Sequence, residues 1–354
     1  MLFRSELLLK NNIKKFGEIS VESFLNVVLY HEKYGYYKKN NIIGKSGDFI
    51  TAPEISQTFG EIISNAFLLN YNEVKNEKVF SLLELGPGRG LLSKDILRTI
   101  KTLNPIFFKK IKNLYFFEKS KYFFNYLKEL HASTIIFDDI GRIPSNFNII
   151  VANEFFDALP VNQFIFTKKN WYEIFIILDN KENFTFTKSK TPIRINHFFP
   201  TNPPEGYVFE YSNYMINLLT NICKNISNFG GIFVIVDYAR NKSNTSGTLA
   251  SLKLHKKVDL FNDIGNCDIS HMPDFELIKK VCIDNKCKAF GPYTQSFFLQ
   301  NYGINERIES LVKSNPKMKN DLQLQKLRLI GQNYMGNIFK VLIITDAKYT
   351  YEFI

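Results

Sequence analysis

Glycines at positions 86, 88 and 90 follow a short apolar run and precede a segment with helical spacing. Glycine lets the backbone approach a ligand closely, and the N-terminus of a helix offers unpaired N–H groups. The spacing G-x-G-x-G differs from the dinucleotide fingerprint G-x-G-x-x-G, in which a pyrophosphate meets the helix. The turn therefore predicts a nucleoside-type cofactor, with candidate contacts at Glu84, Gly86, Pro87, Gly88 and Gly90.

Polar residues follow three further apolar runs, each of which predicts a strand. Residues 114–118 end in Glu118, at about the distance where Rossmann-like sites place a ribose-binding carboxylate. The alternative is that Glu118 caps the next helix. Residues 134–137 have Asp139 and Ile140 at their tip, where many such folds hold the adenine.

Residues 147–152 predict the fourth strand, which runs directly into Asn153 and Glu154. Polar residues at the carboxyl end of a parallel strand face the ligand crevice. Asn153 is therefore a candidate cofactor contact and Glu154 a candidate catalytic residue, with Asp157 second. A structural role for Asp157, tying the turn that contains it, is the alternative.

These residues require an α/β fold with a Rossmann-like sheet. We expect an N-terminal helical region and lid in residues 1–75, a core from 76–160 and 205–354, and a β-rich insertion in 161–204. Within the core, residues 210–224 and 303–330 predict helices, 232–236 and 339–345 predict strands, and 241–275 predict an irregular functional segment.

Residues 51–54 resemble the start of a helix, because Thr51 suits a cap, Pro53 a first turn and Glu54 a capping box. A well-capped helix alone does not explain the preceding Gly47-Asp-Phe or the aromatic cluster in 30–37. We therefore expect residues 47–61 to close over the cofactor, with Thr51 and Glu54 among its contacts.

The composition of the chain disfavours several classes of partner and cofactor. The 354 residues carry a formal charge of +11, but the lysines are scattered, so a nucleic-acid partner is not expected. The four cysteines and five histidines lack the spacing of a disulfide framework or a zinc site. No apolar run has the length of a membrane span, and the first residues do not resemble a signal peptide. We expect a cytoplasmic protein without a metal, which could form oligomers.

Over residues 5 to 345 the chain resembles the MidA family of S-adenosylmethionine (SAM)-dependent protein arginine methyltransferases, which are linked to respiratory complex I assembly. The resemblance rests on Tyr-Gly-Tyr-Tyr with Gly-Asp-Phe-Ile-Thr-Ala-Pro-Glu-Ile-Ser-Gln-Thr-Phe-Gly-Glu, on Glu-Leu-Gly-Pro-Gly-Arg-Gly and on Ala-Asn-Glu-Phe-Phe-Asp-Ala-Leu-Pro-Val. Gly-Thr-Leu with His255, and Met335-Gly-x-x-Phe-Lys-Val-Leu, add to it. His271 stands one residue earlier than the family's histidine, and Glu210-Tyr-Ser-Asn departs slightly at an expected helix start.

The resemblance implies a class I methyltransferase fold, SAM as cofactor and a protein substrate that presents an arginine, such as a complex I subunit. It adds His271 to the candidate catalytic residues, either as a general base or through a structural hydrogen bond. Two other functions stay open. One is an NAD(P)-dependent oxidoreductase, which the glycine spacing disfavours, and the other is a methyltransferase fold that assembles a partner without turnover.

Overall fold

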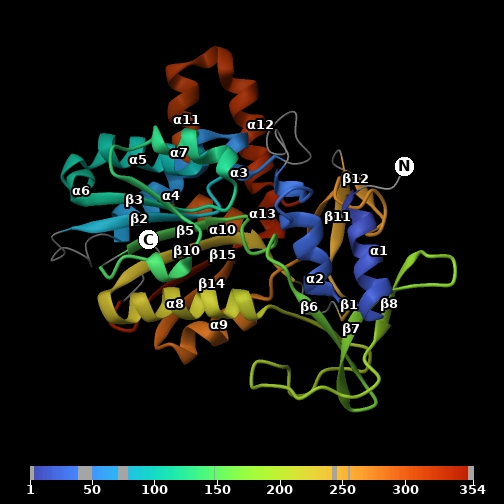
Figure 1. Cartoon of the computed structure of the whole chain (residues 1–354). Coiled ribbons are helices and arrows are strands. Elements are labelled where there is room, and N and C mark those ends of the chain that lie inside the picture. The colour runs from blue at the N-terminus through green and yellow to red at the C-terminus, as the bar shows by residue number, and fades with distance from the viewer. Residues whose placement is uncertain are drawn as a thin grey trace. The chain divides into compact units, whose positions relative to one another are not determined.

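The computed structural model describes residues 4–38, 50–70, 79–146, 148–240, 245–253 and 256–349. The chain forms two compact units (Figure 1). The first unit contains residues 1–49, 156–217 and 240–277, and the second contains 50–155, 218–239 and 278–354. These bounds differ from the expected ranges, because residues 50–75 belong to the second unit and 240–277 to the first.

The second unit contains a seven-stranded sheet in the order β14-β15-β10-β5-β2-β3-β4. The strands from β10 to β4 are parallel, and β15 is antiparallel to both of its neighbours. The expected α/β fold with a Rossmann-like sheet is thus confirmed. The strands are β2 (Phe80–Leu85), β3 (Ile111–Phe117), β4 (Thr134–Phe137), β5 (Asn148–Asn153), β10 (Gly231–Tyr238), β14 (Cys287–Thr294) and β15 (Phe339–Asp346).

Helices cover both faces of this sheet, which explains why β2 and β5 are buried at every residue. Figure 1 shows α4 and α5 on one face and α8 and α9 on the other. The helices are α3 (Ala52–Ile55), α4 (Gln57–Asn70), α5 (Leu91–Leu103), α6 (Pro105–Lys110), α7 (Phe124–Lys128), α10 (Gln295–Asn301), α11 (Ile304–Ser314), α12 (Lys319–Ile330) and α13 (Met335–Ile338), with α8 (Asn213–Phe229) and α9 (Phe275–Asp284) containing residues of both units.

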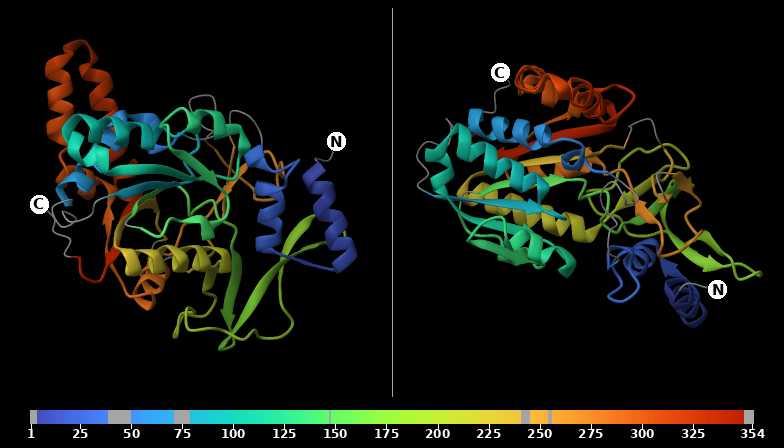
Figure 2. Two further views of the ribbon diagram at one scale, coloured as in Figure 1. Left: turned by 60° about the vertical axis from the view of Figure 1, so that its left-hand side comes forward. Right: turned by 90° about the horizontal axis from the view of Figure 1, so that it is seen from above.

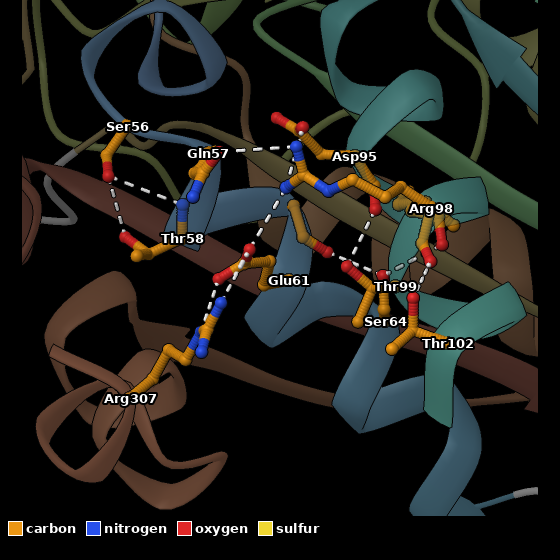
Figure 3. Close-up of polar contacts among 12 residues, drawn as sticks. Ser56, Gln57, Thr58, Glu61, Ser64, Asp95, Arg98, Thr99, Thr102 and Arg307 are labelled. Atoms are coloured by element: carbon orange, nitrogen blue, oxygen red, sulfur yellow. Dashed lines mark hydrogen bonds and ion pairs between the residues drawn. The ribbon is translucent and has the colours of Figure 1, made fainter. Parts of the chain in front are cut away.

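Glu61 joins three helices of the second unit. Its carboxylate accepts hydrogen bonds from Arg98 Nη2 of α5 at 3.0 Å and from Arg307 Nε of α11 at 2.7 Å. Figure 3 shows the two guanidinium groups approaching this carboxylate from different helices. Close packing of α4 on α5 also needs Gly60, because a Cβ there would lie 2.7 Å from Asp95 Cβ.

Helices α11 and α12 form a hairpin, which Figures 1 and 2 show in red, projecting from the sheet. The prediction of one long helix over 303–330 was wrong, because Asn315 ends α11 and Pro316 begins a short 3-10 turn before α12. Proline cannot continue the helix without losing a hydrogen bond. The sequence analysis also missed two strands, β14 and β9 (Val208–Tyr211).

The first unit contains the β-rich insertion. Its larger sheet has the order β1-β7-β6-β9, and β8 pairs with β7. Segment 241–275, predicted to be irregular, contains a three-stranded sheet in the order β12-β11-β13, so that prediction was wrong. The elements are α1 (Arg4–Phe16), β1 (Ile19–Ser20), α2 (Val21–Leu25), β6 (Asn162–Thr167), β7 (Asn170–Leu178), β8 (Phe184–Lys188), β9 (Val208–Tyr211), β11 (Ala250–Lys253), β12 (Lys256–Val258) and β13 (Asp268–Ser270).

The core of this unit packs α1 and α2 against the insertion, through buried residues such as Leu9, Phe24 and Ile176. The predicted N-terminal helical region is therefore confirmed by α1 and α2, although β1 separates these helices and a π-helical turn over Asn26–Tyr30 follows α2. Within the described residues, no helix has the length and apolar character that a membrane span requires.

Candidate active site

The glycine turn connects β2 to α5. Gly86, Gly88 and Gly90 have φ values of +65°, +53° and +73°, a region that favours glycine. The turn is held by a hydrogen bond from Gly86 N to Phe117 O at 3.0 Å and by one from Gly90 N to Pro87 O at 2.8 Å. Gly90 then forms the N-cap of α5. The predicted strand, turn and helix are thus confirmed.

Packing adds a second reason for glycine at both ends of the turn. A Cβ at Gly86 would lie 2.7 Å from Phe155 Cδ2, and one at Gly90 would lie 2.5 Å from Leu130 Cδ1. These two glycines are therefore required by the protein itself, whatever ligand approaches the turn. The sequence pattern could not reveal Phe155 or Leu130 as the reason.

Glu84 is 4% exposed, and its carboxylate accepts hydrogen bonds from Ser93 of α5, including the backbone N–H at 3.2 Å. Burial raises the pKa of Glu84 to about 8, against the opposing effect of the Ser93 hydrogen bonds, and nearby Glu118 raises it further. Glu84 thus joins the end of β2 to the first turn of α5. Its place among the cofactor contacts stays a prediction.

Glu118 follows β3 and lies beside the turn. Its Oε2 accepts a hydrogen bond from Gly88 N at 3.3 Å, and its Oε1 accepts one from Ser120 N at 2.7 Å. Ser120 is the N-cap of the following 3-10 turn. The side chain therefore caps this turn, as the alternative expected, and also lies within reach of a ligand at Gly88.

At the tip of β4, Asp139 is exposed and its Oδ1 accepts a hydrogen bond from Gly141 N at 3.0 Å. Ile140 begins a 3-10 turn over Ile140–Arg142. Both residues follow the carboxyl end of a strand of the same parallel sheet as Glu118, which is the edge where ligands bind in this type of sheet. Their contact with adenine stays a prediction.

Asn153 ends β5, and Glu154 follows with φ +50°, a left-handed conformation that is uncommon outside glycine. Glu154 Oε1 accepts hydrogen bonds from Asn153 Nδ2 and from Ala52 N, each at 3.1 Å. Asn153 is 9% exposed, and its buried Oδ1 has no hydrogen-bond partner among the described residues. An unpaired buried acceptor fits a ligand that brings a donor.

Two contacts hold α3 beside this edge. Ala52 N donates to Glu154, and the carboxylate of Glu54 pairs with Arg89 inside the glycine turn. The helix starts at Thr51 as predicted, but the predicted capping box was wrong, because the Thr51 side chain makes no cap hydrogen bond and Glu54 pairs with Arg89. Residues 47–49 of the expected lid, and His255, lie outside the described residues.

Asp157 and His271 belong to the first unit, where His271 N donates to Asp157 O at 3.0 Å. The His271 ring is buried and lies beside the backbone of Phe156 and Met272. Burial lowers the pKa of His271, although the Glu210 carboxylate opposes this, so the neutral imidazole is favoured near pH 7. Asp157 lies near the hydroxyl of Tyr37, which donates to Asp268 Oδ1 at 3.0 Å.

Sequence reasoning missed two buried carboxylates. Asp237 is fully buried near the end of β10, and the rule that ligands meet the carboxyl ends of strands could have identified it. Glu210 was expected at a helix start but lies in β9, where it accepts hydrogen bonds from Gln163 Nε2 at 2.9 Å and Thr248 N at 2.8 Å. The β-branched and aromatic residues Val208, Phe209 and Tyr211 are the strand signal that could have placed it.

These residues fit a nucleoside cofactor with an amino-acid end. Glu118 offers carboxylate acceptors for hydroxyls beside the glycine turn, and Asn153 offers its unpaired oxygen. The parallel sheet and the glycine turn at the end of β2 therefore define a nucleoside-cofactor-binding α/β protein of the class I methyltransferase type.

Residues 62–293 match the family model described as "Putative S-adenosyl-L-methionine-dependent methyltransferase", and the chain belongs to this family. It is a SAM-dependent methyltransferase, and SAM is its cofactor. Membership in this family disfavours the oxidoreductase alternative.

Curated relatives support the resemblance to the MidA family. The chain is 29% identical to "Protein arginine methyltransferase NDUFAF7, mitochondrial" of Homo sapiens, over 92% of this chain and 80% of the relative. It is 27% identical to the protein of the same name from Xenopus laevis, over 92% of this chain and 79% of the relative.

Among solved structures, a protein of Burkholderia thailandensis bound to S-adenosyl-homocysteine superposes with a TM-score of 0.81. It is 21% identical and the match covers 97% of this chain and 92% of that one. This likeness shows that the fold is shared.

Proposed function

We propose that the chain transfers the methyl group of SAM to an arginine side chain of a protein. The similarity to relatives named protein arginine methyltransferases supports an arginine acceptor. A protein substrate of the kind found in respiratory complex I belongs to the same proposal and follows from the resemblance. A cytoplasmic location is also proposed, because the sequence shows neither a disulfide framework nor the pattern of a signal peptide.

The observation that carries the proposal is the conformation of Glu154. Its φ of +50° places a residue with a long side chain in a left-handed conformation, directly after a strand of the cofactor-binding sheet. Strained backbone of this kind concentrates at functional sites, where the surrounding structure maintains it. The strain directs a carboxylate to the edge of the sheet where SAM is expected.

A carboxylate is what an arginine acceptor needs. The guanidinium group remains protonated near neutral pH, so it is a poor nucleophile, and burying it without a negative partner is costly. SAM supplies an electrophilic methyl group on its sulfonium. Glu154 would accept hydrogen bonds from the guanidinium, hold it in line with that methyl group and offset the positive charge. Asp157 and His271 remain candidate catalytic residues on the sequence pattern and the family resemblance alone.

The test is methyl transfer by Glu154→Gln, which keeps the shape of the side chain and removes its charge. The purified chain is incubated with radiolabelled SAM and a cell lysate, and the labelled residue is identified by mass spectrometry. We expect label on arginine, and a loss of at least about a hundredfold in the variant with SAM affinity little changed. Glu129→Gln, an exposed carboxylate of the same unit, is the control.

Three results would contradict the proposal. Label on another residue type would exclude arginine as acceptor, and equal rates for the variant and the wild type would remove Glu154 from the reaction. A complete absence of label, with SAM bound normally, would favour the methyltransferase-fold scaffold without turnover.

A further inference from the structure

Asp237 is a buried carboxylate that accepts backbone hydrogen bonds at the turn after β5. Its side chain is fully buried, its Oδ2 accepts a hydrogen bond from Phe155 N at 3.2 Å, and its Oδ1 accepts one from Tyr238 N at 2.8 Å. Burying a carboxylate is costly unless hydrogen bonds compensate for the lost water. The two backbone N–H groups donate such hydrogen bonds, and one of them belongs to Phe155, the residue that follows Glu154.

The neighbouring strand holds this turn at two consecutive residues. Asn153 pairs with Val236 in the parallel ladder between β5 and β10. Beyond that pair, Glu154 N donates to Val236 O at 2.9 Å, and Phe155 N donates to Asp237. The backbone N–H groups of Glu154 and of the next residue are therefore both bound by β10. The left-handed conformation of Glu154 thus depends on two acceptors, Val236 O and the Asp237 carboxylate.

Phe155, whose backbone Asp237 binds, also contacts the glycine turn through its side chain. The ring of Phe155 lies against Gly86 and makes an edge contact with Phe117, with ring centroids 6.0 Å apart. A shift of the Phe155 backbone would therefore move both the carboxylate of Glu154 and the ring that limits the space at Gly86.

We propose that Asp237 is a positioning residue for methyl transfer, which fixes the Glu154–Phe155 turn without touching either reactant. The inference rests on the proposed role of Glu154 in holding the acceptor. In Asp237→Asn one carboxylate oxygen becomes an amide NH2, so one of the two backbone N–H groups loses its acceptor and faces a donor. The turn would then be less well held while the strands beside it remain paired.

The first test measures amide hydrogen exchange of Phe155 in the free protein, which requires no acceptor. Phe155 lies beyond the end of β5, so its protection should depend on Asp237. We expect exchange to be slow in the wild type and at least about tenfold faster in Asp237→Asn, with amides inside β5 unchanged. Asp321→Asn, an exposed aspartate of α12, should leave the exchange as in the wild type.

The second test is a double-mutant cycle with Glu154→Gln, using radiolabelled SAM and a pool of arginine-containing peptides. Asp237→Asn alone should lower kcat by about 10- to 50-fold and change SAM affinity less than about threefold, because a misplaced group costs rate more than cofactor binding. In the Glu154→Gln background, Asp237→Asn should lower kcat by less than about a further threefold, because the carboxylate that Asp237 positions has already been removed.

Unchanged exchange at Phe155 in Asp237→Asn, or a full and independent loss of kcat in the Glu154→Gln background, would overturn the inference. If Glu154→Gln itself has no effect, the proposed function fails instead, and the exchange result still decides whether Asp237 holds the turn. Should Asp237→Asn not fold, rapid exchange of the Phe155 amide in the wild type would overturn the inference and slow exchange would support it.

Discussion

The ring of Phe155 fills the space that a side chain at Gly86 would need. A Cβ built on Gly86 would lie 2.7 Å from Phe155 Cδ2, closer than two carbon atoms can approach. The end of β5 and the glycine turn after β2 are therefore fitted to each other. The predicted cofactor site and the proposed acceptor site therefore share one packing contact.

Gly86→Ala should destabilise the protein and weaken SAM binding. The variant has both an unfavourable φ and a clash, so we expect a loss of about 2–4 kcal/mol in the free energy of unfolding. Gly17→Ala is the matched control, because Gly17 has φ +87° and no atom within 4 Å of a Cβ. Urea unfolding of both variants separates the two effects, and equal losses would mean that Phe155 yields without cost.

Glu118→Ala should weaken SAM binding by about one to two decades, since a hydrogen bond to a charged group contributes about 1.5–3 kcal/mol. Isothermal titration with SAM measures this loss, and Glu129→Ala serves as the control. A loss under about threefold would mean that Glu118 only caps the turn at Ser120.

The folded protein should be more stable with glycine than with alanine at position 154. Both replacements remove the carboxylate and should abolish its role in transfer, but only alanine retains the strain at φ +50°. We expect Glu154→Gly to be more stable than Glu154→Ala by about 1 kcal/mol. At Glu129, where φ is −76°, the order should be reversed. The same order at both sites would show that position 154 is not strained in solution.

The raised pKa of Glu84 should make stability depend on pH. Because its pKa is about 8 in the folded chain and ordinarily 4.5, the folded state binds more protons between these values, so stability should fall as pH rises through this interval. Glu84→Gln removes the titration and keeps an acceptor for Ser93. Without SAM, the free energy of unfolding of the variant, relative to that of the wild type, should increase by about 2–4 kcal/mol between about pH 5 and pH 8. The measurement is urea unfolding of both proteins across this pH range. If their free energies of unfolding change with pH in the same way, the pKa of Glu84 is not raised.

Arg307 should stabilise the α11–α12 hairpin through Glu61. Because Glu61 would still bind Arg98, we expect Arg307→Leu to cost only about 1 kcal/mol, less than Glu61→Gln, and to speed amide exchange mainly in α11. Lys313→Leu, an exposed cation of the same helix, is the control. Equal exchange in both variants would exclude an anchoring role.

The core strands were predictable from sequence because β2, β5 and β10 are long enough, and buried enough, to be almost continuously apolar. Glu118 and Asn153 were predictable because they stand at the carboxyl ends of the parallel strands β3 and β5. β14 was missed because its Cys287–Thr294 sequence contains Gly-Pro and alternates poorly. The strands in 241–275 were missed because each has only three or four residues.

Side-chain pairings at the site were less accessible to prediction. Thr51 and Glu54 have the spacing of a capping box, yet Glu54 pairs with Arg89, which is 35 residues further along the chain. A charged partner of this kind competes successfully with a local cap, and only tertiary structure shows it. The same holds for Asp237, whose partner Phe155 N is 82 residues away.

The position of β15 has a consequence for how the chain acquires its fold during synthesis. β15 lies between β10 and β14 and pairs with both, although the ribosome makes it after either of them. Until it emerges, both older strands present open edges with unpaired N–H and C=O groups, which invite pairing with other chains. Nascent chains that stall before Phe339 should therefore be prone to aggregation and dependent on chaperones, even though every strand that leads to the cofactor turn has already been made.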